Sequence, residues 1–334
     1  MKYFLENYNG EDYYLYTISN NDLEISVSEY GATLCNFKYH GLDIVQGFEN
    51  VHSYVDDVRY MNATIGRVCN RIENGRFILN DKEYHVPINN GPNSLHGGDK
   101  AFDTRHWKIK EEGNKLICHY LSKDEEEGYP GNLDVEVVYE LLDDGLKYSY
   151  RGQSDEDTLL NICNHAFFNI NGVTSDSILD DYLYINADYI ARVDSDGCSH
   201  NEVLEVSNTP FDFRKRKKIG QDIDIRHEQI VNANGYDHHY IIKGEGFRHF
   251  CTYDNNKLEL EVYSDLPGMH LYSSNFLEGN SKGKMNATYP RRSAICFETQ
   301  YYPNAINCKD HKKPILLKGE TMYHETIFKI KEMD

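Results

Sequence analysis

Leu133-Asp134-Val135-Glu136-Val137 alternates apolar and acidic residues with a period of two. Because successive side chains of a β-strand point to opposite faces, this alternation predicts a strand with one buried face and one exposed face. The same pattern recurs in Leu23-Glu24-Ile25-Ser26-Val27-Ser28 and in Leu258-Glu259-Leu260-Glu261-Val262. Three such stretches, far apart in the chain, indicate a protein built mainly from strands.

Turn signals separate the predicted strands along the whole chain. The turn dipeptides are Asn74-Gly75, Asn90-Gly91, Asp144-Gly145, Asp196-Gly197 and Asn234-Gly235. Phe77 to Val86 is predicted to be a hairpin that turns at Asn80-Asp81, and the weak helix candidate near Ile219 to Gln229 is short and charged. Strands separated by turns, with only weak helix candidates, predict an all-β fold. The sequence has no linker and no repeat of fixed period. We expect one domain, residues 1–334, folded as a large antiparallel β-sandwich.

The charge balance argues against nucleic-acid and membrane partners. The chain has 54 Asp and Glu residues against 35 Lys and Arg, a formal net charge of −19. Such a field repels phosphate backbones and anionic lipid headgroups. The basic run Arg214-Lys215-Arg216-Lys217-Lys218 is the exception, and we interpret it as a solvated loop. No stretch approaches the ~18 consecutive apolar residues of a membrane helix.

The eight cysteines form no Cys-x-x-Cys pair, so a zinc ribbon or a redox motif is not supported. The first residues, Met1 to Asn7, lack the apolar segment of a signal peptide. These two observations predict reduced thiols and a cytoplasmic location.

Three partial matches to cofactor or metal motifs fail on inspection. Gly244 to His249 begins like a dinucleotide-binding loop but lacks the third glycine, and Gly279 to Lys284 is one residue short of a phosphate-binding loop. His238 and His239 are adjacent, so on a strand they would point to opposite faces and would rarely bind one metal. We therefore expect no organic cofactor and no metal.

Six polar clusters lie in apolar or glycine-bounded settings. They are Gly66 to Ile72, Asn93 to Gly98, Asn161 to Asn169, Gly235 to His238, Pro267 to His270 and Phe297 to Pro303. Taken singly, each has an ordinary explanation: His165 as a hydrogen-bonded core histidine, Arg71 as an ion-pair partner, Asp237 as a turn residue. Similarly, Glu298 could end a buried strand, and His96 could belong to a tight turn.

Taken together and in order, these clusters resemble the aldose 1-epimerase (galactose mutarotase) family, nearly from end to end. The matching blocks are Glu29 to Leu34, Ile65 to Ile72, Pro92 to Gly98, Gly128 to Gly131, Asn164 to Asn169, Thr209 to Gly220, Asp237-His238, Pro267-Gly268 and Glu298 to Asn307. The resemblance implies a β-supersandwich with a shallow cleft for an aldopyranose, without metal or cofactor.

The resemblance also implies roles for individual residues. His165, in Asn-His-Ala-Phe-Phe-Asn, matches the proton donor to the ring oxygen, and Glu298, in Phe-Glu-Thr-Gln, matches the base that takes the proton of the anomeric hydroxyl. His96 matches a residue that holds the sugar and supports the chemistry. The remaining implied substrate contacts are Asn70, Arg71, Phe167, Asp237 and His270.

Three positions depart from the family pattern. Position 270 is His where Gln is frequent, position 304 is Asn where Asp is common, and Phe167 replaces a frequent Tyr. None of these departures affects the implied acid–base pair, so they bear on substrate preference more than on activity.

The implied reaction is the interconversion of the α and β anomers of a free hexose such as galactose or glucose. One base and one acid suffice, because ring opening moves one proton off O1 and another onto O5. Two alternatives stay open: a non-catalytic carbohydrate-binding or sugar-sensing protein, and a hexose-6-phosphate 1-epimerase. The expected partner is a small-molecule aldohexose, bound by a monomer or a homodimer.

Overall fold

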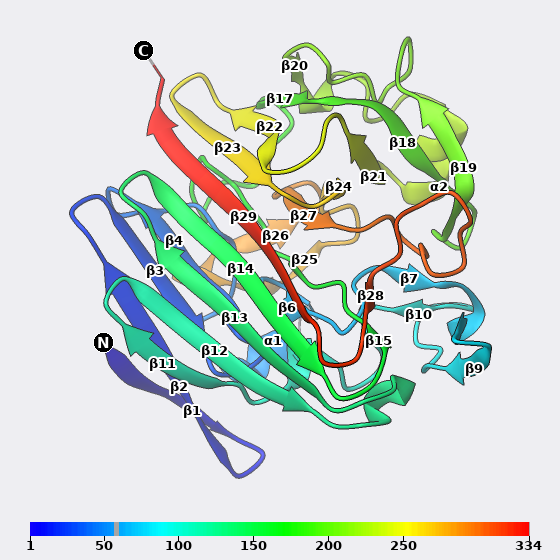
Figure 1. Ribbon diagram of the computed structural model, residues 1–334. Coiled ribbons are helices and arrows are strands. Elements are labelled where there is room, and N and C mark those ends of the chain that lie inside the picture. Colours follow the sequence, from blue (N-terminus) through cyan, green and yellow to red (C-terminus); the bar gives the residue numbers. More distant parts are fainter. Residues whose placement is uncertain (57–59, 334) are drawn as a thin grey trace.

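The computed structural model describes residues 1–56 and 60–333, and its largest sheet holds nine strands (Figure 1). Their spatial order is β11-β12-β13-β14-β29-β23-β22-β17-β20, and neighbouring strands are antiparallel. In chain order the strands are β11 (Lys108–Glu112), β12 (Lys115–Ser122), β13 (Leu133–Leu141), β14 (Gly145–Ser154), β17 (Tyr182–Ile185), β20 (Lys217–Lys218), β22 (Arg248–Asp254), β23 (Leu258–Ser264) and β29 (Thr321–Glu332).

Two five-stranded antiparallel sheets complete the main framework. The N-terminal one has the order β1-β2-β3-β4-β5, with β1 (Lys2–Tyr8), β2 (Glu11–Ser19), β3 (Leu23–Ser28), β4 (Thr33–Tyr39) and β5 (Leu42–Asp43). The other has the order β19-β18-β21-β24-β27, with β18 (Ala187–Val193), β19 (Ser199–Glu205), β21 (Asp237–Ile242), β24 (Gly268–Tyr272) and β27 (Cys296–Gln300).

Short strand pairs and two short helices fill the connections. The pairs are β6 (Thr64–Ile65) with β16 (Cys163–Asn164), β7 (Arg71–Ile72) with β10 (Ser94–Leu95), β8 (Arg76–Leu79) with β9 (Lys82–His85), β15 (Thr158–Leu159) with β28 (Ile315–Leu316), and β25 (Glu278–Lys282) with β26 (Thr288–Pro290). The helices are α1 (Val51–Asp56) and α2 (Glu228–Ala233). Within residues 1–56 and 60–333, no helix is long and apolar enough to cross a membrane.

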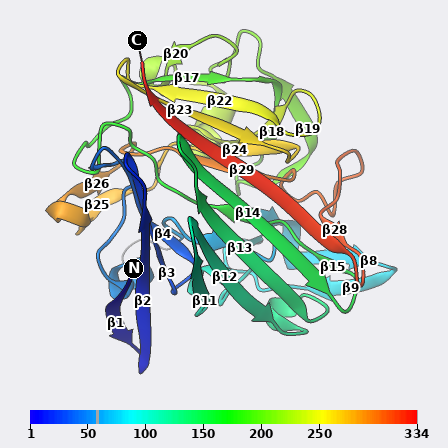
Figure 2. The same cartoon turned by 60° about the vertical axis from the view of Figure 1, so that its left-hand side comes forward.

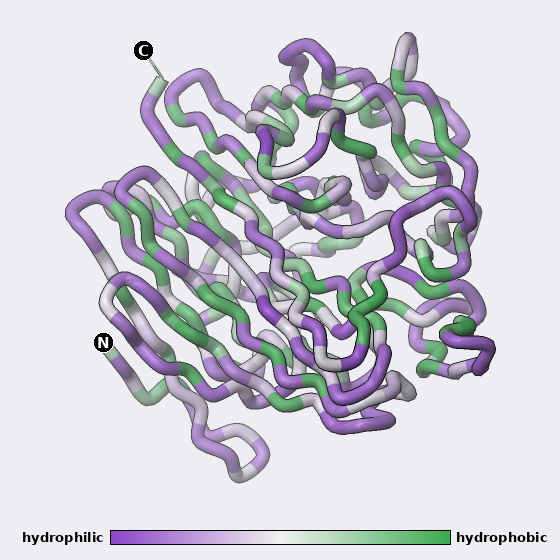
Figure 3. Tube along the Cα trace, in the orientation of Figure 1, coloured by the Kyte–Doolittle hydropathy of each residue, from purple (hydrophilic) through white to green (hydrophobic). Residues whose placement is uncertain are grey.

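The alternating stretches form strands as predicted. Strand β13 alternates buried and less buried positions along its length, and it pairs in unbroken register with β12 and β14. Residues 23–28 form β3 and residues 258–264 form β23. The predicted hairpin at Asn80-Asp81 is also present as β8 and β9. Hydrophilic and hydrophobic residues interleave along the diagonal strands of the large sheet (Figure 3).

The three sheets enclose a shared core. The N-terminal sheet contacts the large sheet where β2 and β3 approach β12 and β13 (Figure 2). One cluster of buried side chains draws on all three sheets, including Ile25 from β3, Val135 from β13, Val262 from β23 and Leu271 from β24. The all-β sandwich prediction is therefore confirmed.

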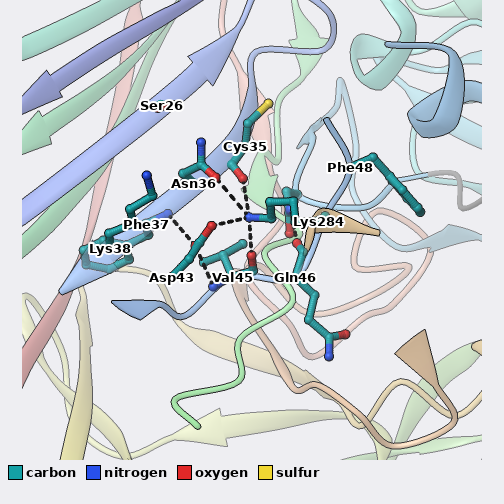
Figure 4. A network of polar contacts seen from close by, with 12 residues as sticks. Ser26, Cys35, Asn36, Phe37, Lys38, Asp43, Val45, Gln46, Phe48 and Lys284 are labelled. Atoms are coloured by element: carbon teal, nitrogen blue, oxygen red, sulfur yellow. Dashed lines mark hydrogen bonds and ion pairs between the residues drawn. The ribbon is translucent and has the colours of Figure 1, made fainter. Parts of the chain in front are cut away.

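A buried lysine ties the β25–β26 hairpin to the N-terminal sheet (Figure 4). The Lys284 ammonium lies 2.6 Å from the Asp43 carboxylate and donates to the carbonyls of Cys35 and Val45, each also at 2.6 Å. Burial lowers the pKa of Lys284, and the neighbouring Asp43 opposes that shift. This anchor fixes the hairpin that directly follows Phe276 and Leu277, which reach the pocket described next.

Candidate active site

All eight side chains implied as site residues line one pocket of about 390 Å³. They are Asn70, Arg71, His96, His165, Phe167, Asp237, His270 and Glu298. The blocks that carry them span more than 220 positions of the chain, so folding alone brings them together. Sequence reasoning missed the rest of the lining: Tyr60, Asn90, Leu95, Tyr272, Phe276 and Leu277.

One side of the pocket, which we call the strand wall, consists of Asp237, His270 and Glu298. These residues lie on the adjacent strands β21, β24 and β27. His270 is the direct partner of Glu298 in the β24–β27 register. Asp237 is paired with Tyr272, two residues after His270, so period two places all three side chains on one face of the sheet.

A second group of lining residues, which we call the loop wall, consists of Asn70, Arg71, His96 and His165. Asn70 and His96 flank the two-residue strands β7 and β10 and have φ values of 61° and 55°. His165 follows β16 and is held by backbone hydrogen bonds with Ala63 and Asn62. These side chains are therefore aimed by left-handed and irregular backbone rather than by a long strand ladder.

The two walls contact each other at His165 and Glu298, and also at Asn70 and His270. His165 Nε2 lies 3.4 Å from Glu298 Oε1, and the side chains are 8% and 1% exposed. The second carboxylate oxygen of Glu298 accepts a long hydrogen bond of 3.6 Å from the Cys163 thiol. His165 Nδ1 is buried and has no hydrogen-bond partner within residues 1–56 and 60–333. An imidazole and a buried carboxylate, two groups of the kind used in general acid–base catalysis, thus face each other in the pocket.

Asp237 is held as an anion by its neighbours. Its Oδ1 lies 2.6 Å from His270 Nε2. Burial alone would raise the pKa of Asp237, but the hydrogen bond from His270 and the nearby charge of Arg71 hold that pKa below its usual value. An ionised carboxylate accepts hydrogen bonds only, which suits the hydroxyl groups of a neutral ligand.

Arg71 keeps most of its donors available. Its Nε donates to Asn90 Oδ1 at 3.0 Å, and among the described residues no carboxylate pairs with its guanidinium. The guanidinium lies against Gly197, where a Cβ atom would come within 2.9 Å of Arg71 Cζ. In a chain with a net charge of −19, the remaining donors of this guanidinium are thus not taken up by a carboxylate of the described residues and are available to a molecule in the pocket.

Aromatic rings close one end of the pocket. Phe167 stacks on the His165 ring with centroids 5.1 Å apart, and Tyr272 meets both rings edge-on at 6.0 Å. Phe276 stacks on Tyr272 and is 62% exposed at the rim. Flat apolar faces beside hydrogen-bonding groups match the two kinds of surface on a pyranose ring. The period of two from His270 would have identified Tyr272.

His96, His165 and Glu298 are close enough to suggest a metal site, since their ligand atoms lie within 4.8 Å of one another. The hydrogen bonding of His96 does not fit one. Its Nδ1 accepts the backbone N–H of Asn70 at 3.2 Å. A neutral imidazole has a single ring lone pair, so none remains for a metal.

The basic run lies outside this pocket and is largely neutralised. Arg216 forms two hydrogen bonds with Asp254, at 2.7 and 2.6 Å, and Arg214 pairs with Asp212. Lys217 and Lys218 pair with Asp222 and Asp180. These residues line a different cavity, so they supply no phosphate-binding cations to the pocket that holds His165 and Glu298.

A β-sandwich with a pocket of this size, in which polar groups converge beside aromatic rings, has the form of a small-molecule binding site. Among solved structures, it is similar to galactose 1-epimerase from Lactobacillus acidophilus NCFM, with a TM-score of 0.90 and 27% identity, covering 100% of this chain and 99% of that one. The curated galactose mutarotases of Bos taurus and Homo sapiens are each 38% identical, over 94% of this chain and 93% of theirs.

A family model described as aldose 1-epimerase matches residues 14–329. The chain therefore belongs to the aldose 1-epimerase family and is an isomerase, as the resemblance implied.

Proposed function

We propose that this protein interconverts the α and β anomers of free hexoses such as galactose and glucose, with Glu298 as the base and His165 as the acid. The observation that carries this proposal is the 3.4 Å approach of His165 Nε2 to Glu298 Oε1 inside the pocket. The names of the curated relatives, galactose mutarotase and aldose 1-epimerase, support the same reaction.

The reaction needs two proton transfers and one bond rotation. Glu298 takes the proton of the anomeric hydroxyl while His165 donates a proton to the ring oxygen, and the C1–O5 bond breaks to give the open-chain aldehyde. Rotation about C1–C2 turns the other carbonyl face toward O5. Closure then reverses both proton transfers and inverts the anomer. A positioned acid or base typically contributes about 10²–10⁴-fold, which suits a reaction that also proceeds uncatalysed.

The other pocket residues hold the sugar still during this cycle. Arg71 offers forked donors, and Asp237 and His96 bind hydroxyl groups. Asn70, Phe167 and His270 complete the proposed contacts, with the Phe167 face placed against an apolar side of the ring. Holding the ring fixed matters because catalysis requires O1 and O5 to stay within reach of two groups at once.

Polarimetry on freshly dissolved α-galactose and α-glucose tests the proposal. The protein should accelerate the optical decay, and His165→Asn or Glu298→Ala should lower turnover about 10²-fold or more while the fold is retained. Near-normal turnover in either variant would remove that residue from the mechanism. A carbohydrate-binding protein without activity would leave the decay unchanged, and faster decay of glucose 6-phosphate than of glucose would favour the phosphosugar reaction.

We further propose one domain spanning residues 1–334, acting as a monomer or homodimer in the cytoplasm. The core cluster shared by all three sheets supports a single domain. The eight cysteines are all free and buried, which supports a reducing compartment.

A further inference from the structure

Asn70 contacts two of the three pocket histidines. Its backbone N–H donates to His96 Nδ1 at 3.2 Å, and its side-chain Nδ2 lies 3.2 Å from His270 Nδ1. The His96 backbone N–H in turn donates to the Asn70 carbonyl at 3.0 Å, so the two residues are joined twice. Asn70 and both histidines are almost fully buried.

The orientation of the Asn70 amide follows from its other hydrogen bond. Its Oδ1 accepts the backbone N–H of Arg71 at 2.8 Å. The opposite end of the amide, which faces His270, is therefore the NH₂ group, a donor. His270 Nδ1 must accept this bond, and the ring proton must lie on Nε2, where it is donated to Asp237 at 2.6 Å.

The same argument applies to His96. A backbone N–H can only donate, so His96 Nδ1 is an acceptor and a neutral His96 carries its proton on Nε2. His165 differs from both, because its Nδ1 has no partner among the described residues and its Nε2 faces Glu298. Of the three pocket histidines, His165 alone is left without a donor that fixes its protonation state.

We propose that Asn70 is a positioning residue that fixes His96 and His270 as neutral Nε2–H tautomers. This inference rests on the proposed function and deepens it. His96 then has no ring lone pair left with which to act as a base, and His270 keeps Asp237 oriented. Proton exchange with the ring oxygen is left to His165. In this assignment the Asn70 amide acts through the histidines rather than chiefly through a sugar hydroxyl.

The test is to read the ring nitrogens directly by NMR of protein labelled with ¹⁵N-histidine at neutral pH. Signals are assigned with His96→Gln and His270→Gln variants. In the unaltered protein both rings should show a protonated Nε2 and an unprotonated Nδ1. A protonated Nδ1 on either ring would overturn the proposal, whether or not the protein is active.

Asn70→Asp then changes the side-chain contact with His270 and leaves the backbone hydrogen bond to His96 in place. Aspartate tolerates the left-handed backbone at this position, where φ is 61°, and replaces the NH₂ donor with an acceptor oxygen. His270 Nδ1 should gain a proton while His96, held by the backbone, stays unchanged. An unaltered His270 signal would contradict the proposal.

Kinetics provide the second readout. Because His165 and Glu298 are untouched, Asn70→Asp should raise KM about tenfold and change kcat far less. A fall in kcat alone would contradict a positioning role. Asn9→Asp is the matched control, since Asn9 has φ of 52° and is exposed in a surface turn, and it should alter neither the histidine signals nor the kinetics. If no variant and no substrate shows activity, the proposed function fails, and the tautomer assignment is still read separately.

Discussion

The two walls of the pocket position their side chains by different means. On the strand wall, Asp237, His270 and Glu298 are neighbours because three paired strands are in register. On the loop wall, Asn70 and His96 are aimed by left-handed backbone beside two-residue strands. A ladder fixes side chains through regular backbone hydrogen bonds, whereas an irregular segment needs other partners for its backbone and its orientation.

Those partners centre on Arg67, in the segment that leads to Asn70. The buried Arg67 guanidinium makes six hydrogen bonds, to Ser122, Lys123, Pro130, Gly131 and Thr158. Four of these bonds go to backbone carbonyls between the end of β12 and Gly131. The comparison indicates that the loop wall depends on a few buried side chains for an order that the strand wall obtains from many backbone bonds.

The largest expected effect removes that support. Arg67→Met leaves buried carbonyls without donors and should lower the free energy of unfolding by about 3 kcal/mol or more. The counterpart on β27, the strand that carries Glu298, is Thr299→Val, which removes the 2.6 Å hydrogen bond to Thr326. It should cost about 1 kcal/mol. Denaturant unfolding of both variants measures the difference, and equal losses would break the comparison.

The second effect concerns the pH dependence of stability and His238, which lies on the face of β21 opposite to Asp237. Burial lowers the pKa of His238 to about 3, while the unfolded chain has an ordinary pKa near 6.5. Between these values the unfolded state binds more protons, so stability should fall as pH drops below 6.5. One such histidine contributes at most about 1.4 kcal/mol per pH unit. His238→Gln should flatten the slope of unfolding free energy against pH, and an unchanged slope would contradict the assignment.

The third and smallest effect concerns the packing of the Arg71 guanidinium against Gly197. A Cβ at Gly197 would come within 2.9 Å of the Arg71 guanidinium, so Gly197→Ala should displace it and raise KM roughly fivefold, about 1 kcal/mol. Gly319→Ala is the control, because its φ of 74° matches the 75° of Gly197 and its Cβ would meet nothing within 4 Å. Both variants strain the backbone similarly. If both raised KM equally, the contact with Arg71 would not be the cause.

The same contrast explains how far the sequence could predict the structure. Period-two alternation predicted β3, β13 and β23 because it follows directly from strand geometry. It could have added Tyr272, which shares a face with His270. No local pattern indicated that Gly66 to Ile72 would place Asn70 between two histidines, because that placement depends on contacts with distant segments.

Some of the positions that depart from the family pattern line the pocket, and one lies outside it. Asn304 lies outside the pocket lining, accepts the backbone N–H of Glu73 and donates to the Ser199 carbonyl. His270 lines the pocket and contacts Asp237 directly. The sequence could mark these positions as unusual, but only the structure separates them: His270 and Phe167 line the pocket and are placed to affect substrate preference, whereas Asn304 is not.

The central claim is that one group from each wall acts on the same hemiacetal. The direct test is a double-mutant cycle of His165→Asn and Glu298→Gln, with anomer exchange rates measured by NMR for all four proteins. If the two groups act as a unit, the double variant should be about as slow as the slower single variant. Losses that multiply, or a single variant with near-normal exchange, would contradict the account.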